Sequence, residues 1–473
     1  MGGSSVMLRS IFTTFANCFK IPELKSRILF TALLLGICRL ASLIPTPGLN
    51  SQLLVQYFQS AAGRNTGGGG LMGMYSMFTG GGFEKCAVGS LGIMPYISAT
   101  IVLQLLQAVI PSLSKLAREE GGRAKLIQRG RYLTVGLCLI QGLVMAISWE
   151  HPSDVFSGFK GELVMVHALW WYRIQTTLVL TTGTILLMWL GEQITDRGIG
   201  NGISLIITIG ILARLPQMAL GLKDMFLTPD RSTGEYQYNM FHFAAMMMLL
   251  AAVIAGIVAV TQAQRKIPVQ YAQRVVGRKT YSGGSSFMPL RVNYAGVMPV
   301  IFASAILMFL TFLPKYLGTH YSNYAFGVLL TEIAASLDRG SFLYLTMYGL
   351  MILFFSYFWV ATQFNEIQIA DDMKKGGGYV PGVRPGQATS DFLHKTMSRI
   401  TLAGAIFLTI IATVPIIMSS WMNIPQQVSQ FFGGTSLLIM VGVMLDTMRQ
   451  MEAQLLTRQY PGFLKKGRVK GRF

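Results

Sequence analysis

Long apolar stretches recur along this chain, and several reach the roughly 18–20 residues that cross the hydrocarbon core of a bilayer. A soluble chain would carry about a quarter charged residues, whereas 12% of these 473 residues are charged and 52% are hydrophobic. We therefore expect an all-α integral membrane protein that buries its apolar surface in lipid. Its ten predicted transmembrane helices are residues 28–44, 92–110, 131–149, 175–194, 202–222, 240–261, 296–314, 343–362, 400–420 and 430–448.

The distribution of lysine and arginine between the loops predicts the orientation. With the N-terminus in the cytosol, 29 of the 39 basic residues fall on the inside and 9 on the outside. Cytosolic loops carry the excess of basic residues in membrane proteins, so both termini are expected in the cytosol, which requires an even number of spans. Residues 1–20 lack the layout of a cleaved signal peptide, so the first span is expected to stay in the mature protein.

A short internal repeat opens the second and seventh spans. The segment GIMPYISATIVL at residues 92–103 and the segment GVMPVIFASAIL at residues 296–307 are identical at six of twelve positions. Because the two copies lie five spans apart, they cross the membrane in opposite directions. This predicts two inverted five-helix halves with a path or site between them. Chance similarity between apolar helices is the alternative.

Six motifs in register make the chain resemble the bacterial Sec translocon channel subunit, the SecY family. They are residues 92–106, 189–206, 264–274, 298–305, 378–386 and 432–438. The resemblance implies a central hourglass pore between the halves, closed by a plug when idle. The expected domains are the N-terminal tail 1–27, the halves 28–222 and 240–449, the basic cytosolic loops 262–295 and 363–399, and the C-terminal tail 450–473.

The resemblance also implies a ring of aliphatic side chains at the waist of the pore. Isoleucine fits this role, because a narrow apolar constriction resists wetting and offers a moving chain no polar partner. Ordinary packing against lipid or neighbouring helices is the alternative for each residue. The expected ring is Ile93, Ile97, Ile203, Ile207, Ile301 and Ile439.

The plug implied by the resemblance is residues 71–83, which we name the plug segment. Its apolar side chains can seal the waist, and the flanking glycines at 67–70 and 80–82 supply flexible hinges. An ordinary outside loop is the alternative. The expected sealing residues are Leu71, Met72, Met74, Tyr75, Met77 and Phe78.

Two further sites follow from the resemblance. Polar residues on the second and seventh spans would line a lateral gate to lipid, although Gln104 could equally make an ordinary hydrogen bond between helices. Basic loop residues would dock a motor ATPase or the ribosome, with a simple topology signal as the alternative. The gate residues are Ser98, Thr100, Gln104 and Ser304, and the docking residues are Arg265, Lys266, Arg274, Arg278, Lys279, Lys374, Lys375 and Arg384.

Two motifs suggest chemistry that the sequence does not support. The glycine-rich segment 198–202 lacks the strand and the Lys-Ser/Thr of a phosphate loop, so a tight hairpin turn is expected there. Arg39, inside the first span, is expected to extend to the nearby membrane surface. The four cysteines have neither disulfide nor metal-ligand spacing. We expect no catalytic residues, no metal and no cofactor, and hence no enzyme.

The resulting hypothesis is a protein-conducting channel in the bacterial cytoplasmic membrane, gated by signal sequences and driven from outside. The expected partners are small Sec membrane subunits of the SecE and SecG type, the motor ATPase SecA, the ribosome, signal peptides, nascent chains and anionic lipids. A secondary transporter with inverted repeats is the alternative. Such a transporter would place paired ionisable residues at mid-membrane, and the spans hold almost none away from their ends.

Overall fold

The structure is a computed structural model of the chain. It describes residues 21–61, 75–76, 78–119, 121–155, 159, 161–227, 238, 240–271, 274–276, 279–281, 284–320, 324–337, 341–421 and 434–459.

Each of the ten predicted spans overlaps a helix. The first half contains α2 (Pro22–Ala41), α3 (Ser51–Ala61), α5 (Met94–Val109), α6 (Pro111–Arg118), α7 (Gly122–Glu150), α8 (Pro152–Val155), α9 (Leu169–Arg197), α10 (Gly202–Leu212) and α11 (Leu215–Leu227). The second half contains α12 (Met240–Gln262), α13 (Met298–His320), α14 (Ala325–Ser336), α15 (Phe342–Gln363), α16 (Glu366–Lys375), α17 (Gln387–Trp421) and α19 (Gly434–Gln459).

Six helices of the described chain are long and apolar enough to cross a membrane. They span Ala124–Glu150, Leu169–Arg197, Gly202–Lys223, Phe241–Gln262, Phe342–Lys375 and Gln387–Met418. The remaining four predicted spans coincide with α2, α5, α13 and α19. The third of the six was predicted as one helix, but a turn at Ala213 and Arg214 divides it into α10 and α11.

The two copies of the internal repeat start their helices in the same way. Gly92 and Gly296 both have a left-handed backbone, and α5 and α13 each begin at the methionine two residues later. Pro95 and Pro299 then occupy the first turn, where proline suits a helix because its missing N–H needs no partner. The two copies of the repeat therefore share their backbone conformation as well as their sequence.

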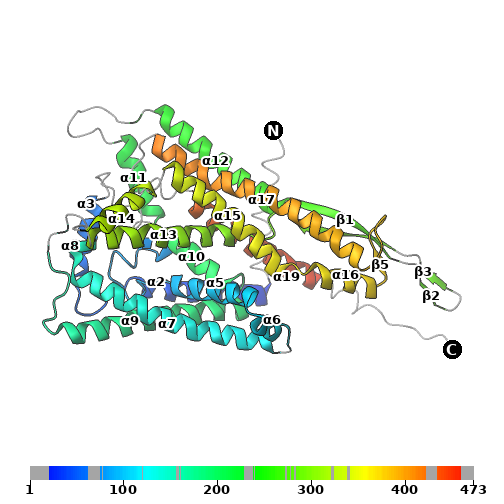
Figure 1. Ribbon diagram of the computed structural model, residues 1–473, viewed down its shortest axis with the longest axis horizontal. Coiled ribbons are helices and arrows are strands. Elements are labelled where there is room, and N and C mark those ends of the chain that lie inside the picture. The colour runs from blue at the N-terminus through cyan, green and yellow to red at the C-terminus, as the bar shows by residue number, and fades with distance from the viewer. Residues whose placement is uncertain are drawn as a thin grey trace.

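The helices form an elongated body with distinct ends (Figure 1). The predicted cytosolic elements α6, α16 and the strands gather at one end, and the predicted outside elements α3, α8 and α14 lie at the other. The largest apolar cluster draws side chains from both halves, and α10 of the first half packs against α19 of the second. The contact between the halves is thus the core of the molecule.

The two predicted cytosolic loops contain strands that the all-α prediction did not include. They are β1 (Gln264–Tyr271), β2 (Arg274–Val276), β3 (Lys279–Tyr281), β4 (Ser285–Arg291) and β5 (Gly378–Tyr379). Strand β1 pairs antiparallel with β4, from Gln264 opposite Arg291 to Gln270 opposite Ser285. Ile267 and Val269 are buried while their neighbours are exposed, which is the alternation that a strand over an apolar cluster requires.

The predicted turn between α9 and α10 is confirmed, and it ties several helices together. Asn201 caps α10 by accepting hydrogen bonds from the amides of Ile203 and Ser204. The amide of Gly200 donates to Gln450 Oε1 of α19 at 2.9 Å, and the amide of Ile199 donates to Thr31 Oγ1 of α2 at 3.1 Å. This turn therefore links the first half directly to the last helix.

Helices α7 and α9 are joined by an ion pair near each end. Arg131 donates from Nε and Nη2 to the two carboxylate oxygens of Glu192, at 3.0 and 2.8 Å. Arg173 donates in the same two-pronged manner to Glu150, at 2.9 Å for both bonds. Such paired bonds fix orientation as well as distance.

Candidate functional site

The residues of the predicted ring come together in one apolar cluster. Ile97 lies on α5, Ile207 on α10, Ile301 on α13 and Ile439 on α19, so each half contributes two helices. Ile439 is fully buried, and the other three are at most 6% exposed. Apolar side chains from four helices thus meet where the two halves face each other.

Of the two remaining ring residues, Ile93 belongs to the same cluster and Ile203 packs against it. Ile93 is 2% exposed and precedes the first residue of α5. Ile203, in the first turn of α10, is half-buried and packs against the cluster.

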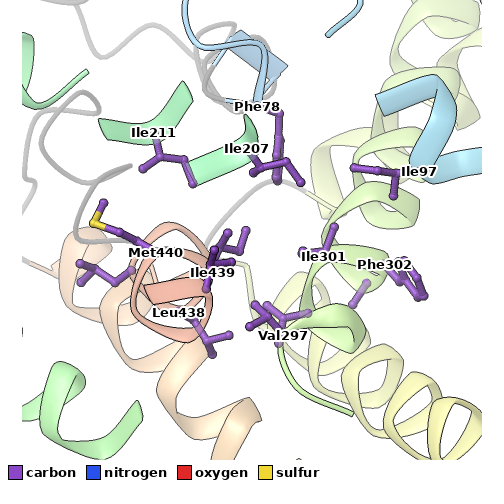
Figure 2. Close-up of a cluster of buried hydrophobic side chains, with 14 of the residues drawn as sticks. Phe78, Ile97, Ile207, Ile211, Val297, Ile301, Phe302, Leu438, Ile439 and Met440 are labelled. Atoms are coloured by element: carbon purple, nitrogen blue, oxygen red, sulfur yellow. The ribbon is translucent and has the colours of Figure 1, made fainter. Parts of the chain in front are cut away.

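Among the described residues of the plug segment, Phe78 enters this cluster. Phe78 is 5% exposed and belongs to the cluster. Figure 2 shows Phe78 directed towards Ile207, with Ile97 and Ile301 reaching in from helices on the other side. The aromatic ring therefore lies among the isoleucines that the sequence predicted as the waist.

Tyr75, another predicted sealing residue, lies outside this cluster. Tyr75 packs in a second apolar cluster, with its ring 5.2 Å from that of Phe83 in an edge-on arrangement. The predicted sealing residues Leu71, Met72, Met74 and Met77 lie outside the described residues.

Two arginines that the sequence analysis did not assign to the site bind the plug segment and Glu84, the residue that directly follows it. Arg39 of α2 donates from Nη1 to the carbonyl oxygen of Gly80 at 2.8 Å. Arg214 donates to Ser76 Oγ and to the Glu84 carboxylate. Ser76 Oγ in turn donates to Glu84 Oε1 at 2.7 Å.

The prediction that Arg39 extends to the membrane surface is therefore wrong. Its guanidinium turns inward, because the Gly80 carbonyl offers an acceptor within reach. The signal that could have identified it is an ionisable residue inside a span, which marks a functional site by default.

Gly80 fits between these partners only because it has no side chain. A Cβ atom there would lie 2.4 Å from Arg39 Nη1 and 3.0 Å from Gly210 Cα. Its φ of +64° is also a conformation that other residues rarely adopt. The glycine lets the plug segment touch the α10 backbone and the arginine at once.

The predicted gate residues lie on α5 and α13, but their hydroxyls bond within their own helices. Thr100 donates to the carbonyl of Ile97, and Ser304 to the carbonyl of Ile301, both at 2.8 Å. Gln104 Oε1 is buried and has no hydrogen-bond partner among the described residues, and Ser98 is half-buried. The hydroxyls of Thr100 and Ser304 therefore bond within α5 and α13 and not from one helix to the other.

The predicted docking residues are brought together by the small sheet. Strand β5 of the second loop pairs with β1 of the first, with Gln270 opposite Tyr379. The sheet therefore connects Arg265 and Lys266 on β1 to the segment after β5, which carries the exposed Arg384. Lys374 and Lys375, exposed in the last turn of α16, belong to the same region.

The backbones of Arg274 and Lys279 lie on the paired strands β2 and β3, while Arg278 lies outside the described residues.

Metal-binding and thiol chemistry have little support in the described part of the chain. No group of three or more His, Cys, Asp or Glu residues there could hold a metal ion. Cys38, Cys86 and Cys138 are free and buried. Burial raises the pKa of the Cys86 thiol to about 12, so this thiol stays protonated at neutral pH.

Comparison with known proteins gives the family. The SecY family model matches residues 87–448. Protein translocase subunit SecY of Chlamydia trachomatis serovar D is 42% identical over 468 residues, covering 97% of this chain and 99% of the relative. The Thermotoga maritima protein of the same name is 38% identical over 466 residues, covering 98% and 100%.

Solved structures show the same fold at lower sequence identity. A structure described as a protein conducting channel has a TM-score of 0.58 at 16% identity, covering 92% of this chain and 93% of that chain. Sec61 in the canine ribosome–channel complex from the endoplasmic reticulum has a TM-score of 0.55 at 16% identity, covering 92% and 93%. This chain therefore belongs to the SecY family of protein translocase subunits, and its function is that of a protein-conducting channel.

Proposed function

We propose that polypeptides pass between the two halves of the chain, through the waist formed by the six isoleucines. The observation that carries this proposal is the cluster in which Ile97, Ile207, Ile301 and Ile439 meet from four helices of both halves. A constriction of this kind dewets and blocks ions, yet it holds no polar group that would bind a moving chain. In this closed arrangement Phe78 fills the waist from the plug segment.

Deletion of residues 71–83 tests the proposal. The purified variant, reconstituted into planar bilayers, is expected to conduct ions when no polypeptide is present, whereas the unmodified chain is expected to stay closed. A variant with conductance equal to that of the unmodified chain contradicts the plug.

We further propose that signal sequences open the channel sideways between α5 and α13. The helices carry Ser98, Thr100, Gln104 and Ser304, and the hydroxyls of Thr100 and Ser304 bond within their own helices, so they would add little to the contacts between α5 and α13. An apolar signal helix could displace such contacts and reach lipid. The halves at 28–222 and 240–449 would then be the bodies that move apart.

The exposed basic residues on β1, α16 and the loop after β5 support a docking role for the two loops, which the sheet joins into one surface. The proposed partners are the motor ATPase SecA and the ribosome, with small subunits of the SecE and SecG type in the membrane and anionic lipids around them. We propose the bacterial cytoplasmic membrane as the location, with both termini in the cytosol. Energy would come from these partners, and the chain itself would catalyse no reaction.

The secondary transporter is the weaker candidate. The shared family favours a channel, and the described residues that form the waist are apolar.

A further inference from the structure

We propose that Arg39 and Arg214 form a polar latch, together with Ser76, Gly80 and Glu84, that holds the plug segment closed. The latch would set how readily the channel opens. This inference rests on the proposed role of residues 71–83 as a plug.

The contact between Arg214 and Glu84 is the main fastening. Both side chains are more than four-fifths buried, with 17% and 19% of their surfaces exposed. Arg214 sits in the turn between α10 and α11, so two helices fix its position. A charged pair of this kind is costly to break one partner at a time, because the remaining charge is left without compensation.

Arg39 supplies a second, independent fastening from another helix. It belongs to α2 and binds the backbone of the plug segment at Gly80, so no side chain of that segment is needed. The two arginines therefore hold the segment from different elements, Arg39 at Gly80 and Arg214 at Ser76 and at Glu84, which directly follows the segment. Release requires both contacts to break.

The latch partners all lie in the first half of the chain, whereas Phe78 seals against residues of both halves. Parting of the halves would loosen the seat of Phe78 but would leave the arginine contacts intact. Withdrawal of the plug segment is then a separate step with its own barrier. Opening would thus take two steps, in which the two halves separate and the arginine contacts of the plug segment break.

The latch is built so that it can release. Arg39 and Arg214 lie near enough to repel each other, and Arg214 Nε is buried without a hydrogen-bond partner in the described part of the chain. Water entering an opening funnel would satisfy this donor and the surplus positive charge. Hydration therefore offsets part of the loss when the contacts break.

The test compares neutral variants of the latch with a matched control. Glu84→Gln and Arg214→Gln remove the charge pair, while Arg173→Gln removes another hydrogen-bonded arginine–glutamate pair, which joins α7 and α9 away from the latch residues. Each variant is reconstituted for ion conductance and assayed for export of a reporter with a defective signal sequence. Membrane abundance and thermal stability in detergent are measured alongside.

The latch variants are expected to leak ions several-fold more than the unmodified chain and to export the defective reporter, whereas Arg173→Gln is expected to do neither. If Glu84→Gln folds poorly, the double exchange Glu84→Arg with Arg214→Glu keeps the test open, because a restored pair should restore closure. An unrestored leak in a well-folded double variant counts against the pair.

The outcomes separate this inference from the proposed function. If deletion of residues 71–83 leaks while Glu84→Gln and Arg214→Gln stay closed and selective, the plug stands and the latch is wrong. If the deletion itself does not leak, the plug is wrong and the latch is overturned with it.

Discussion

Gly92 and Gly296 hold the same left-handed backbone, with φ of 58° and 64°, at equivalent places in the two halves. They differ in what surrounds them. A Cβ atom on Gly92 would lie 3.2 Å from the buried Thr79 side chain in the plug segment, whereas one on Gly296 would meet nothing within 4 Å. The same turn therefore starts both helices, but only the first copy supports the plug segment.

This difference predicts separate effects of two alanine substitutions. Gly92→Ala and Gly296→Ala should each lower stability by about 1–2 kcal/mol, because a side chain disfavours the left-handed backbone. Only Gly92→Ala should also push Thr79 and raise ion leakage in proteoliposomes. Equal leakage from the two variants would show that the contact with Thr79 does not matter for closure.

Polar substitution in the ring should relax the choice of substrate. Ile301→Asn and Ile439→Asn place a polar group in the waist, where it costs about 1–3 kcal/mol if unsatisfied. Both are expected to export a reporter with a defective signal sequence, measured as the processed fraction in cells. Ile352→Asn on α15 is the control, because Ile352 is also fully buried in the cluster but lies outside the predicted ring. Export by all three variants alike would assign the effect to general loosening.

Charge reversal in the second loop should impair the drive for export. Arg384 is exposed after β5, so Arg384→Glu is expected to reduce ATPase-driven translocation into proteoliposomes several-fold while the chain still inserts normally. Lys115→Glu, an exposed change on α6 outside the docking set, is the control. Full translocation by the Arg384 variant argues against docking at this loop.

The Cys86 thiol should report the closed state. It is fully buried, and burial raises its pKa from the ordinary value to about 12. The protonated form therefore persists through pH 8, and only the thiolate reacts readily. In a chain with Cys18, Cys38 and Cys138 replaced by serine, maleimide labelling of the resting channel should be far slower than that of an exposed thiol. Rapid labelling at pH 7 in the resting state contradicts this closed packing.

The helices could be predicted from the sequence because bilayer thickness dictates the length of an apolar span. All ten spans coincide with helices, and the one missed break falls at Ala213 and Arg214. Pro216 follows two residues later in the first turn of α11, a position that proline favours, so a local signal for a new helix start was present.

The small sheet was harder to predict. Strand β1 has only a short alternation around Ile267 and Val269, and Pro268 between them argues against a central strand. Proline is tolerated here because β5 pairs with β1 at Gln270 and Tyr271, beyond Pro268. At Pro268 itself, β1 pairs with β4 on one side.

The polar contacts of the plug segment could not be read from local pattern. Arg39 and Gly80 are 41 residues apart, and Arg214 and Glu84 are 130 residues apart. Which acceptor an arginine finds across such a distance depends on how the helices pack. Hydropathy and residue spacing give no information on such contacts. The sequence therefore predicted the apolar ring residues but not the arginine contacts of the plug segment.

The two ion pairs between α7 and α9 lie nineteen residues apart on each helix, from Arg131 to Glu150 and from Arg173 to Glu192. At 1.5 Å per residue this separation is about 28 Å, which is close to the roughly 30 Å of a bilayer's hydrocarbon core. The distance between the two ion pairs along α7 and α9 therefore matches the thickness of the hydrocarbon core. A thicker bilayer would bury these charged groups in hydrocarbon, and a thinner one would expose the apolar side chains between them, so we expect this pair of helices to favour one depth in the membrane.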